Sequence, residues 1–204
     1  MAEKTAKSGK KYHHGNLRAA LIEASLELIQ EKGARALTLR EVASAVGVSR
    51  MAPYRHFTNR SDLLWEISEA GFGKFADALE TAKAGAPADF ASQLDAMALA
   101  YVRFSMQHQA YYEIMFGHPV EAEQGSKRSS PNGERAFGIL LQTVLDGQAS
   151  GAVRDQDPML LARAVWSLVH GISTLRLETD MTEGGAGARF VLFCSEVLRT
   201  GLVR

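Results

Sequence analysis

The chain has 204 residues, which is long enough for one or two domains with a buried core. Its 46% hydrophobic and 23% charged residues are typical of an ordinary globular protein. No apolar run approaches the roughly 18 residues that a membrane-spanning helix needs, so we expect no membrane partner. The single cysteine, Cys194, excludes an internal disulfide and indicates a cytoplasmic location.

The formal net charge is zero, yet the charges are divided unequally along the chain. Residues 1–60 carry 11 Lys and Arg against 5 Glu, a net charge of +6, which leaves −6 for residues 61–204. A basic N-terminal part joined to an acidic C-terminal part favours a polyanionic partner for the former.

Residues 1–12 are small, polar and basic, and we expect this arm to be disordered in the free protein. No apolar stretch follows its lysines, so it is not a secretory signal. Two roles remain open for Lys7, Lys10 and Lys11. They either contact DNA phosphates or the minor groove, or they belong to a solvated tail.

A first helix is expected after Asn16, which is a good N-cap residue, and it should end at Gly33. Residues 38–57 then have the pattern of a helix-turn-helix. Thr38 and Glu41 form a capping box, and apolar residues follow at i, i+3, i+4 and i+7: Leu39, Val42, Ala43 and Val46. Gly47 is expected to end this helix in a left-handed conformation.

After Gly47, Ser49 is expected to cap a second short helix, whose large apolar anchor is Phe57. The rest of this helix is polar, so one face should be reserved for a partner. Two short helices around a glycine also occur in proteins that bind no nucleic acid, but the surrounding positive charge favours DNA.

The position of each side chain in the helix-turn-helix indicates which part of DNA it can contact. Arg50, Met51 and Ala52 occupy the N-terminal turn that meets base edges, where arginine pairs with guanine and apolar groups touch thymine methyls. Arg40 is a further candidate for a base, and the hydroxyl and ring groups of the unit are candidates for phosphates. The predicted DNA-binding residues are Thr38, Arg40, Ser49, Arg50, Met51, Ala52, Tyr54, His56 and Arg60.

The remainder of the chain is predicted to be helical. A long helix begins at about Ser61 and is closed by residues 85–87; a second contains Phe90 to Phe104, and a short one lies near 110–117. Residues 118–133 are a loop by composition. Three more helices are expected near 134–149, 157–178 and 186–201. No strand-like alternation is present, so the fold class is all-α with about nine helices.

The last two expected helices are apolar over more than half of their circumference, which predicts burial on two sides. One side would pack on the chain's own core and the other on a second copy of the chain, in a four-helix dimer interface. The predicted interface residues are Val165, Leu168, Val169, Phe190, Val197 and Leu198.

Three segments together resemble the N-terminal domain of the TetR family of bacterial repressors: residues 13–24 (HHGNLRAALIEA), 38–57 and 59–64 (NRSDLL). Residues 111–117 (YYEIMFG) and 166–171 (WSLVHG) resemble a subgroup with a Trp…His-Gly signature in its C-terminal domain. Pro53 departs from the pattern, because it removes an amide donor near the start of the second short helix.

The resemblance implies a DNA-binding domain at 13–60 and a ligand-binding and dimerisation domain at 61–204. It also implies a small-molecule effector pocket in the C-terminal domain. Large aromatics with polar tips are the candidate lining, for a flat or aromatic ligand with one polar handle, although an aromatic stripe is more often plain core. These residues are Tyr101, Phe104, Tyr111, Met115, Phe116, Trp166 and His170.

Other chemistry finds little support in the pattern. His13 and His14 lack the partner spacing of a metal site, and Cys194 lies within an apolar stripe, so no metal or cofactor is predicted. A helical enzyme using His170 with Tyr112 or Glu113 is one alternative, and a sequence-blind DNA-binding protein is another. The favoured function is a homodimeric repressor that binds a palindromic operator and is released by a small, mostly apolar effector.

Overall fold

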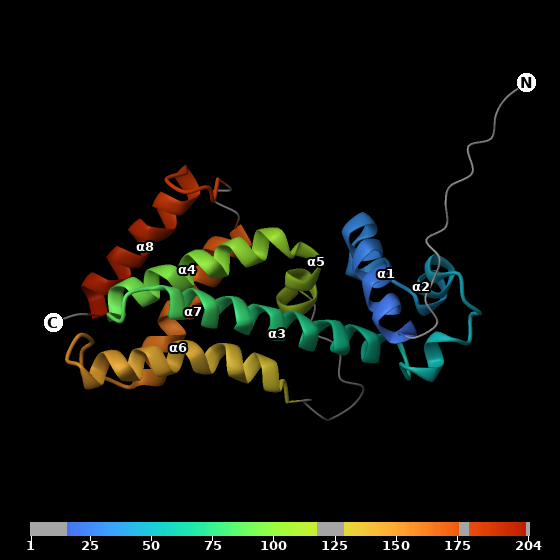
Figure 1. Ribbon diagram of the computed structural model, residues 1–204, viewed down its shortest axis with the longest axis horizontal. Helices are drawn as coiled ribbons and strands as arrows, with labels where there is room; N and C mark the ends of the chain where they lie inside the picture. The colour runs from blue at the N-terminus through green and yellow to red at the C-terminus, as the bar shows by residue number, and fades with distance from the viewer. Residues whose placement is uncertain (1–15, 118–128, 176–179, 203–204) are drawn as a thin grey trace, which may run out of the picture. The chain divides into compact units, whose positions relative to one another are not determined.

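The computed structural model describes residues 16–117, 129–175 and 180–202 (Figure 1). The chain divides into two units, Met1–Leu63 and Leu64–Arg204, which are considered separately. Within the described ranges every regular element is helical, and there are eight α-helices. The predicted all-α class is confirmed. The basic arm, His13, His14 and most of the predicted loop lie outside the described residues.

The first unit begins with two helices whose ends follow from local capping. In α1 (Leu17–Lys32), the Asn16 side chain accepts a hydrogen bond from the Ala19 N–H at 3.2 Å. In α2 (Leu39–Val46), the Thr38 hydroxyl accepts one from the Glu41 N–H at 3.3 Å. Gly47 then adopts the left-handed conformation at φ 75°, which only glycine adopts without strain, so the helix stops there.

The second helix of the helix-turn-helix differs from the prediction. Residues 49–52 form turns rather than an α-helix, and only a 3₁₀ turn, η2 (Pro53–Arg55), follows. The reason is Pro53: it has no N–H to donate to the Ser49 carbonyl, which accepts instead from the Ala52 N–H at 2.9 Å. The eight α-helices, against about nine expected, reflect this missing element.

The core of the first unit lies between α1 and α2, with Leu21, Val42 and Phe57 among its buried side chains. The 3₁₀ turn η1 (Ala34–Ala36) joins these two helices. Helix α3 (Arg60–Gly85) starts one residue before the predicted Ser61 and ends at Gly85 as expected. It is the one element that contributes residues to both units.

The second unit contains the rest of α3 and the helices α4 (Phe90–Gln107), α5 (Gln109–Tyr112), α6 (Pro131–Ala149), α7 (Pro158–Leu175) and α8 (Ala186–Leu202). A π-helical turn, η3 (Glu113–Gly117), continues from α5. The loop predicted for residues 118–133 ends earlier than expected, because residues 131–133 already belong to α6. Pro131 takes the first helical position, and the Ser130 hydroxyl caps the helix by accepting from the Gly133 N–H at 2.9 Å.

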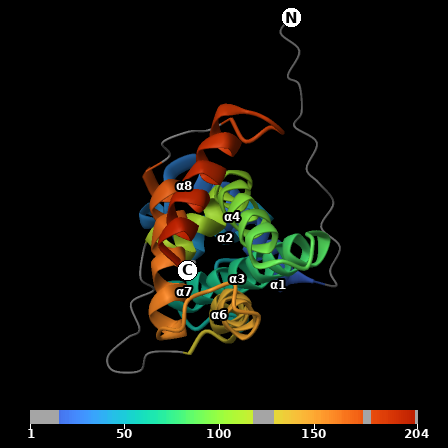
Figure 2. The ribbon, with the colours of Figure 1, turned by 90° about the vertical axis from the view of Figure 1, so that its left-hand side faces the viewer.

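Helix α4 is central to the second unit, because it packs against α6, α7 and α8. Figure 2 shows α7 and α8 side by side, and these two helices are in contact. The core is rich in aromatic and branched side chains from α3, α4, α6 and α7, with Phe75, Tyr101 and Val165 among the buried members. None of the helices described here is long and apolar enough to cross a membrane.

Candidate DNA-binding surface and ligand cavity

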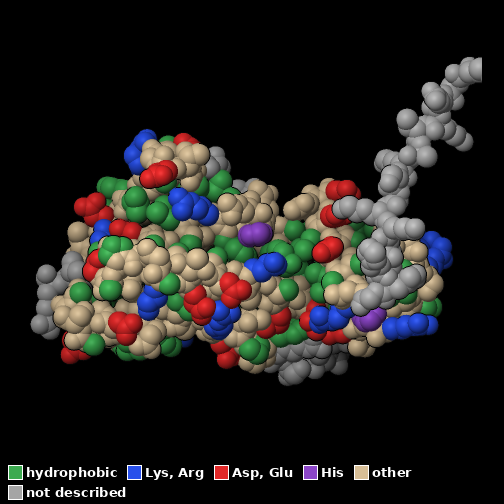
Figure 3. Space-filling view, viewed as in Figure 1, with side chains coloured by type: hydrophobic (Ala, Val, Ile, Leu, Met, Phe, Trp, Pro, Cys, Tyr) green, Lys and Arg blue, Asp and Glu red, His purple; other side chains and the backbone are tan. Residues whose placement is uncertain are grey.

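The turn that replaces the second short helix presents an exposed, mostly polar surface. Arg50 is exposed, and so are two large side chains, Met51 (67% exposed) and Tyr54 (51%). Figure 3 shows Lys and Arg side chains at the right-hand margin of this unit. The other exposed candidates are Thr38, Arg40, Ser49 and His56. Arg55, which the sequence interpretation left out, is also exposed beside them.

Thr38 is held within a small polar network at the start of α2. Its hydroxyl donates to the Glu41 carboxylate at 2.6 Å, and Lys32 forms an ion pair with the same carboxylate. The hydrogen bond from Lys32, followed by that from Thr38, lowers the pKa of the Glu41 carboxyl. The network orients the N-terminus of α2, whose unpaired amides can meet a phosphate.

Two predicted DNA contacts have internal roles instead. Ala52 is buried at 9% exposure, because the turn before Pro53 brings it against the core of its unit. Arg60 donates from Nε to the Leu37 carbonyl at 2.8 Å and from an Nη to the Ala34 carbonyl at 2.7 Å. Sequence position alone could not reveal this, since the two carbonyls lie 23 and 26 residues away along the chain. The guanidinium therefore joins the start of α3 to η1.

Replacing Arg60 with Ala should destabilise the first unit by about 1–3 kcal/mol, because two partly buried carbonyls lose charged donors. Urea unfolding measures this loss. Arg55→Ala is the matched control: Arg55 is exposed, so its removal should change the free energy of unfolding by less than about 0.5 kcal/mol. An Arg60→Ala protein of unchanged stability but weakened DNA affinity would restore Arg60 to the contact surface.

In the second unit, most of the predicted effector residues gather in one aromatic cluster. The Trp166 ring packs edge-on against Tyr101, with ring centres 5.4 Å apart, and Phe116 packs similarly against His170 at 4.9 Å. Phe104 packs on Phe75 at 5.1 Å. These rings fill space between helices, as a well-packed core does.

Tyr111 and Met115 have a different place. Both side chains lie against Gly71 of α3, where an added Cβ would come within 2.9 Å of Tyr111 Cδ1 and 2.8 Å of Met115 Sδ. Only a residue without a side chain permits this close approach of α5 and η3 to α3. The two residues therefore form part of the contact with α3, and neither lines the cavity described below.

His170 is engaged by its own neighbours. The hydroxyl groups of Tyr101 and Tyr112 each lie 2.9 Å from Nδ1, and Thr174 Oγ1 lies 3.4 Å from Nε2. An Nδ1 with one free lone pair accepts from one of the two phenols, which favours the tautomer with the hydrogen on Nε2; the Tyr112 hydroxyl also lies 3.5 Å from Thr174 Oγ1. Burial lowers the pKa of His170 and raises that of Tyr101, so both groups are neutral at pH 7.

This network predicts a pH dependence. Because the pKa of His170 in the folded protein lies below its value of about 6.5 in the unfolded chain, stability is full above pH 6.5 and falls as the pH decreases through that value. His170→Asn should reduce this fall between pH 6.5 and 5, as measured by urea unfolding at each pH. His56→Asn, which removes an imidazole outside this network, is the control. Equal slopes in all three proteins would contradict the prediction.

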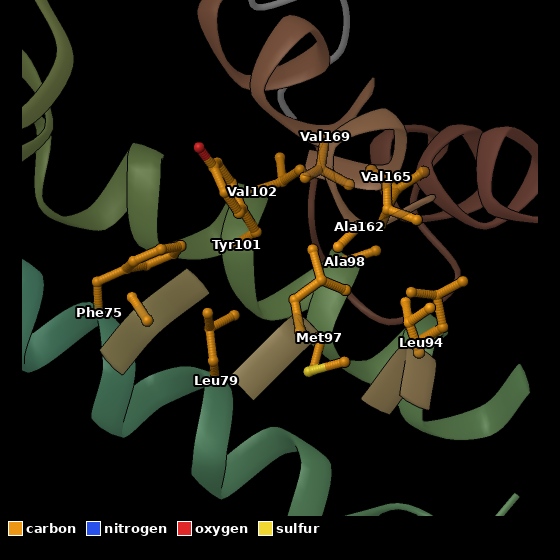
Figure 4. Packing of buried hydrophobic residues seen from close by; sticks show 14 of the residues in the cluster. Phe75, Leu79, Leu94, Met97, Ala98, Tyr101, Val102, Ala162, Val165 and Val169 are labelled. Atoms are coloured by element: carbon orange, nitrogen blue, oxygen red, sulfur yellow. The ribbon is translucent and has the colours of Figure 1, made fainter. Parts of the chain in front are cut away.

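A small apolar cavity of about 20 Å³ lies between α3, α4, α6 and α7. Figure 4 shows several of the side chains that line it, among them Leu79, Met97 and Tyr101. Its lining overlaps the predicted effector residues only at Tyr101 and Trp166. The sequence could not indicate the others, because they are ordinary core residues by type. The cavity is lined by Leu79, Leu94, Met97, Ala98, Tyr101, Leu140, Val165, Trp166 and Val169.

The six predicted dimer residues have three different environments. Val165 and Val169 are buried in the chain's own core, at 3% and 7% exposure, so they do not form an interface. Leu168, Val197 and Leu198 instead line a groove on α7 and α8. Phe190 is half-buried against the core.

Phe193, which was not among the predicted interface residues, lines the same groove. Phe193 and Val197 are 61% and 55% exposed, and they lie one helical turn apart on α8. Cys194 and Gly201 complete the lining. We call the side chains that line this groove the α8 face. Apolar residues this large are seldom left in water in such proximity.

Within the described ranges, no group of three or more His, Cys, Asp or Glu side chains is arranged to hold a metal ion. Arrangements of this kind are the usual mark of a metal centre.

Two family models match the chain. The model of bacterial regulatory proteins of the tetR family matches residues 21–67, and that of the tetracyclin repressor-like C-terminal domain matches residues 94–193. The first match spans the helix-turn-helix, and the second spans α4 to much of α8.

Relatives agree with this assignment. The HTH-type transcriptional regulator Rv1816 of Mycobacterium tuberculosis is 24% identical over 143 residues, which cover 69% of this chain and 61% of the relative's length. The HTH-type transcriptional regulator AcrR of Shigella flexneri is 38% identical over 60 residues, 28% of each chain.

Solved structures show the same fold. A protein of unknown function from Rhodococcus sp. RHA1 has a TM-score of 0.80 and 29% identity, and the match covers 96% of this chain and all of that one. The TetR family regulator PfmR of Thermus thermophilus has a TM-score of 0.68 and 23% identity, over 90% and 96% of the two chains. The helix-turn-helix, the C-terminal helical unit and these matches together show that the chain belongs to the TetR family of transcriptional regulators.

Proposed function

We propose that this regulator is a homodimeric repressor, which binds a palindromic operator through its helix-turn-helix units and is released when a small molecule binds the second unit. The observation that carries the proposal is the exposed turn with Arg50, Met51 and Tyr54, because it joins a cationic group to apolar and hydroxyl groups at the end of α2. This is the set of groups that reads bases and holds phosphates.

Dimerisation is supported by the α8 face. A second copy of the chain can cover this face without any other protein. A two-fold axis would place the α8 face of one copy against the α8 face of the other. Two DNA-binding units related by such an axis recognise two half-sites in opposite orientation, which is the reason for proposing a palindromic operator. The apolar cavity in the second unit is the proposed binding site of the effector.

Release by the effector follows from linkage. An effector that binds more tightly to a conformation unsuited to the operator must weaken DNA binding, and the operator must weaken effector binding by the same factor. Helix α3 is the proposed connection, since it contains residues of both units and its Leu79 lines the cavity. Gly71 on the same helix receives Tyr111 and Met115, so a shift of α3 would disturb a tight contact.

Selection of bound duplexes from a random DNA pool tests the proposal. We expect an inverted repeat to be enriched, with affinity at least about 10³-fold above that for random duplex at physiological salt. Equal affinity for all duplexes would favour a sequence-blind DNA-binding protein. Enrichment of a single, unrepeated half-site would contradict the dimer.

A further inference from the structure

The lining of the cavity in the second unit is almost entirely apolar. Its walls are aliphatic side chains together with the rings of Tyr101 and Trp166, and no charged side chain lines it among the residues that the structure describes. Leu79, Met97 and Leu140 reach it from three different helices, α3, α4 and α6. The lining is therefore made of side chains that belong to the hydrophobic core or pack against it.

The one hydroxyl group on the lining is already used. Figure 4 shows the Tyr101 oxygen directed away from the cluster formed by Met97 and Leu94. That oxygen lies 2.9 Å from His170 Nδ1, where Tyr112 also binds. Because the imidazole is neutral, the network provides no positive charge for an anion. A charged ligand in the cavity would lose its hydration without gaining a partner.

The size of the cavity sets a second limit. About 20 Å³ is close to the space of one water molecule, but a water there would find too few polar partners, so the cavity stays dry. A larger guest needs side chains to move. Met97 is the flexible member of the lining, since its unbranched chain has several rotamers of similar energy.

We propose that the effector of this regulator is an uncharged, nonpolar molecule, a small aromatic or branched hydrocarbon, which enters the cavity by displacing Met97. The inference rests on the proposed effector-controlled function and names the class of ligand. It replaces the polar handle expected from the sequence, because the one hydroxyl group on the lining, that of Tyr101, is already engaged with His170.

Heavy-atom quenching of Trp166 provides a direct test. The chain has two tryptophans, so Trp65→Phe leaves Trp166, which lines the cavity, as the single indole. Bromobenzene and 4-bromobenzoate are a matched pair, since both carry the same quenching atom and ring, and only the second is charged. We expect saturable quenching by bromobenzene, with at least tenfold weaker binding of 4-bromobenzoate. Quenching of equal strength by both would overturn the proposed ligand class.

Two variants in the Trp65→Phe background locate the binding site. Ala98→Val fills the cavity and should weaken bromobenzene binding at least tenfold, whereas Leu140→Ala enlarges it and should strengthen binding at least threefold. Ala100→Val is the matched control, because Ala100 lies on the same helix but does not line the cavity. Responses to bromobenzene that are the same in all three variants would place the ligand elsewhere and overturn the proposal.

These titrations contain no DNA, so their outcome is independent of the operator selection. A protein that selects an inverted repeat but shows no saturable quenching by bromobenzene would retain the proposed repressor function and lose the proposed ligand class. Release of the selected operator by bromobenzene, but not by 4-bromobenzoate, would support both.

Discussion

Replacing Val197 with Glu should convert the proposed dimer into monomers and lower operator affinity by roughly 100-fold or more. Val197 is 55% exposed and lies one turn from Phe193 on the α8 face. A stable interface on this face should bury more than about 1,000 Å² in total, and a carboxylate at its centre would be desolvated without a partner. A single half-site offers only half of the contacts, so loss of the dimer is expected to bring binding close to the nonspecific level.

Thr200→Glu is the control for this change, because Thr200 is an exposed polar residue of the same helix and does not line the groove. Sedimentation velocity gives the mass of each protein, and a titration of the selected operator gives its affinity. Thermal unfolding of both variants separates loss of assembly from loss of folding. A Val197→Glu monomer that binds the operator as tightly as the parent chain would refute the dimer model.

The α8 face also illustrates the limits of a sequence interpretation. The apolar stripes on α7 and α8 correctly indicate helices with little polar surface, but they do not say which side meets the chain's own core. Val165 and Val169 turn inward, while Phe193 and Val197 turn outward. The choice depends on how α7 packs against α4 and α6, and that packing is a property of the tertiary structure.

Local signals were more reliable. The ends of α1 and α2 are fixed by hydrogen bonds within a few residues, at Asn16, Thr38 and Gly47, and the sequence placed all three. Pro53 was recognised as a disturbance, but its consequence, a 3₁₀ turn in place of a helix, depends on which N–H group replaces the missing donor to the Ser49 carbonyl. The role of Arg60 depends on carbonyls distant in sequence, so it was missed.

In the proposed effector site, too, the sequence indicates local spacing but not tertiary packing. Trp166 and His170 are four residues apart and share a helix face, which the sequence can indicate, and the structure places both against Tyr101. The cavity, however, lies on the aliphatic side of Tyr101 and Trp166. Small voids arise where side chains fail to fill the space between helices, and residue type gives no sign of them.

Replacing Arg50 with Ala should weaken operator binding by about 1–3 kcal/mol for each half-site, which is the usual contribution of an arginine that contacts a guanine. Arg50 is exposed in the turn after Gly47, and its neighbour Ala52 is buried, so of the two only Arg50 can reach a base edge. In a symmetric dimer both copies lose the contact, and the two losses should nearly add because the half-sites are well separated.

The position of the loss distinguishes a base contact from a phosphate contact. If Arg50 reads a base, selection with the Arg50→Ala protein should show relaxed preference at one symmetric pair of operator positions and unchanged preference elsewhere. Arg35→Ala is the control, since Arg35 is exposed in η1 and lies outside the proposed surface. A uniform loss of affinity on every sequence, with a salt dependence reduced by about 0.9 per lost contact, would assign Arg50 to the phosphates instead. The turn around Pro53 would then position the unit on DNA, and base recognition would pass to other exposed groups of the same surface, with Arg40, Met51 and Tyr54 as the candidates.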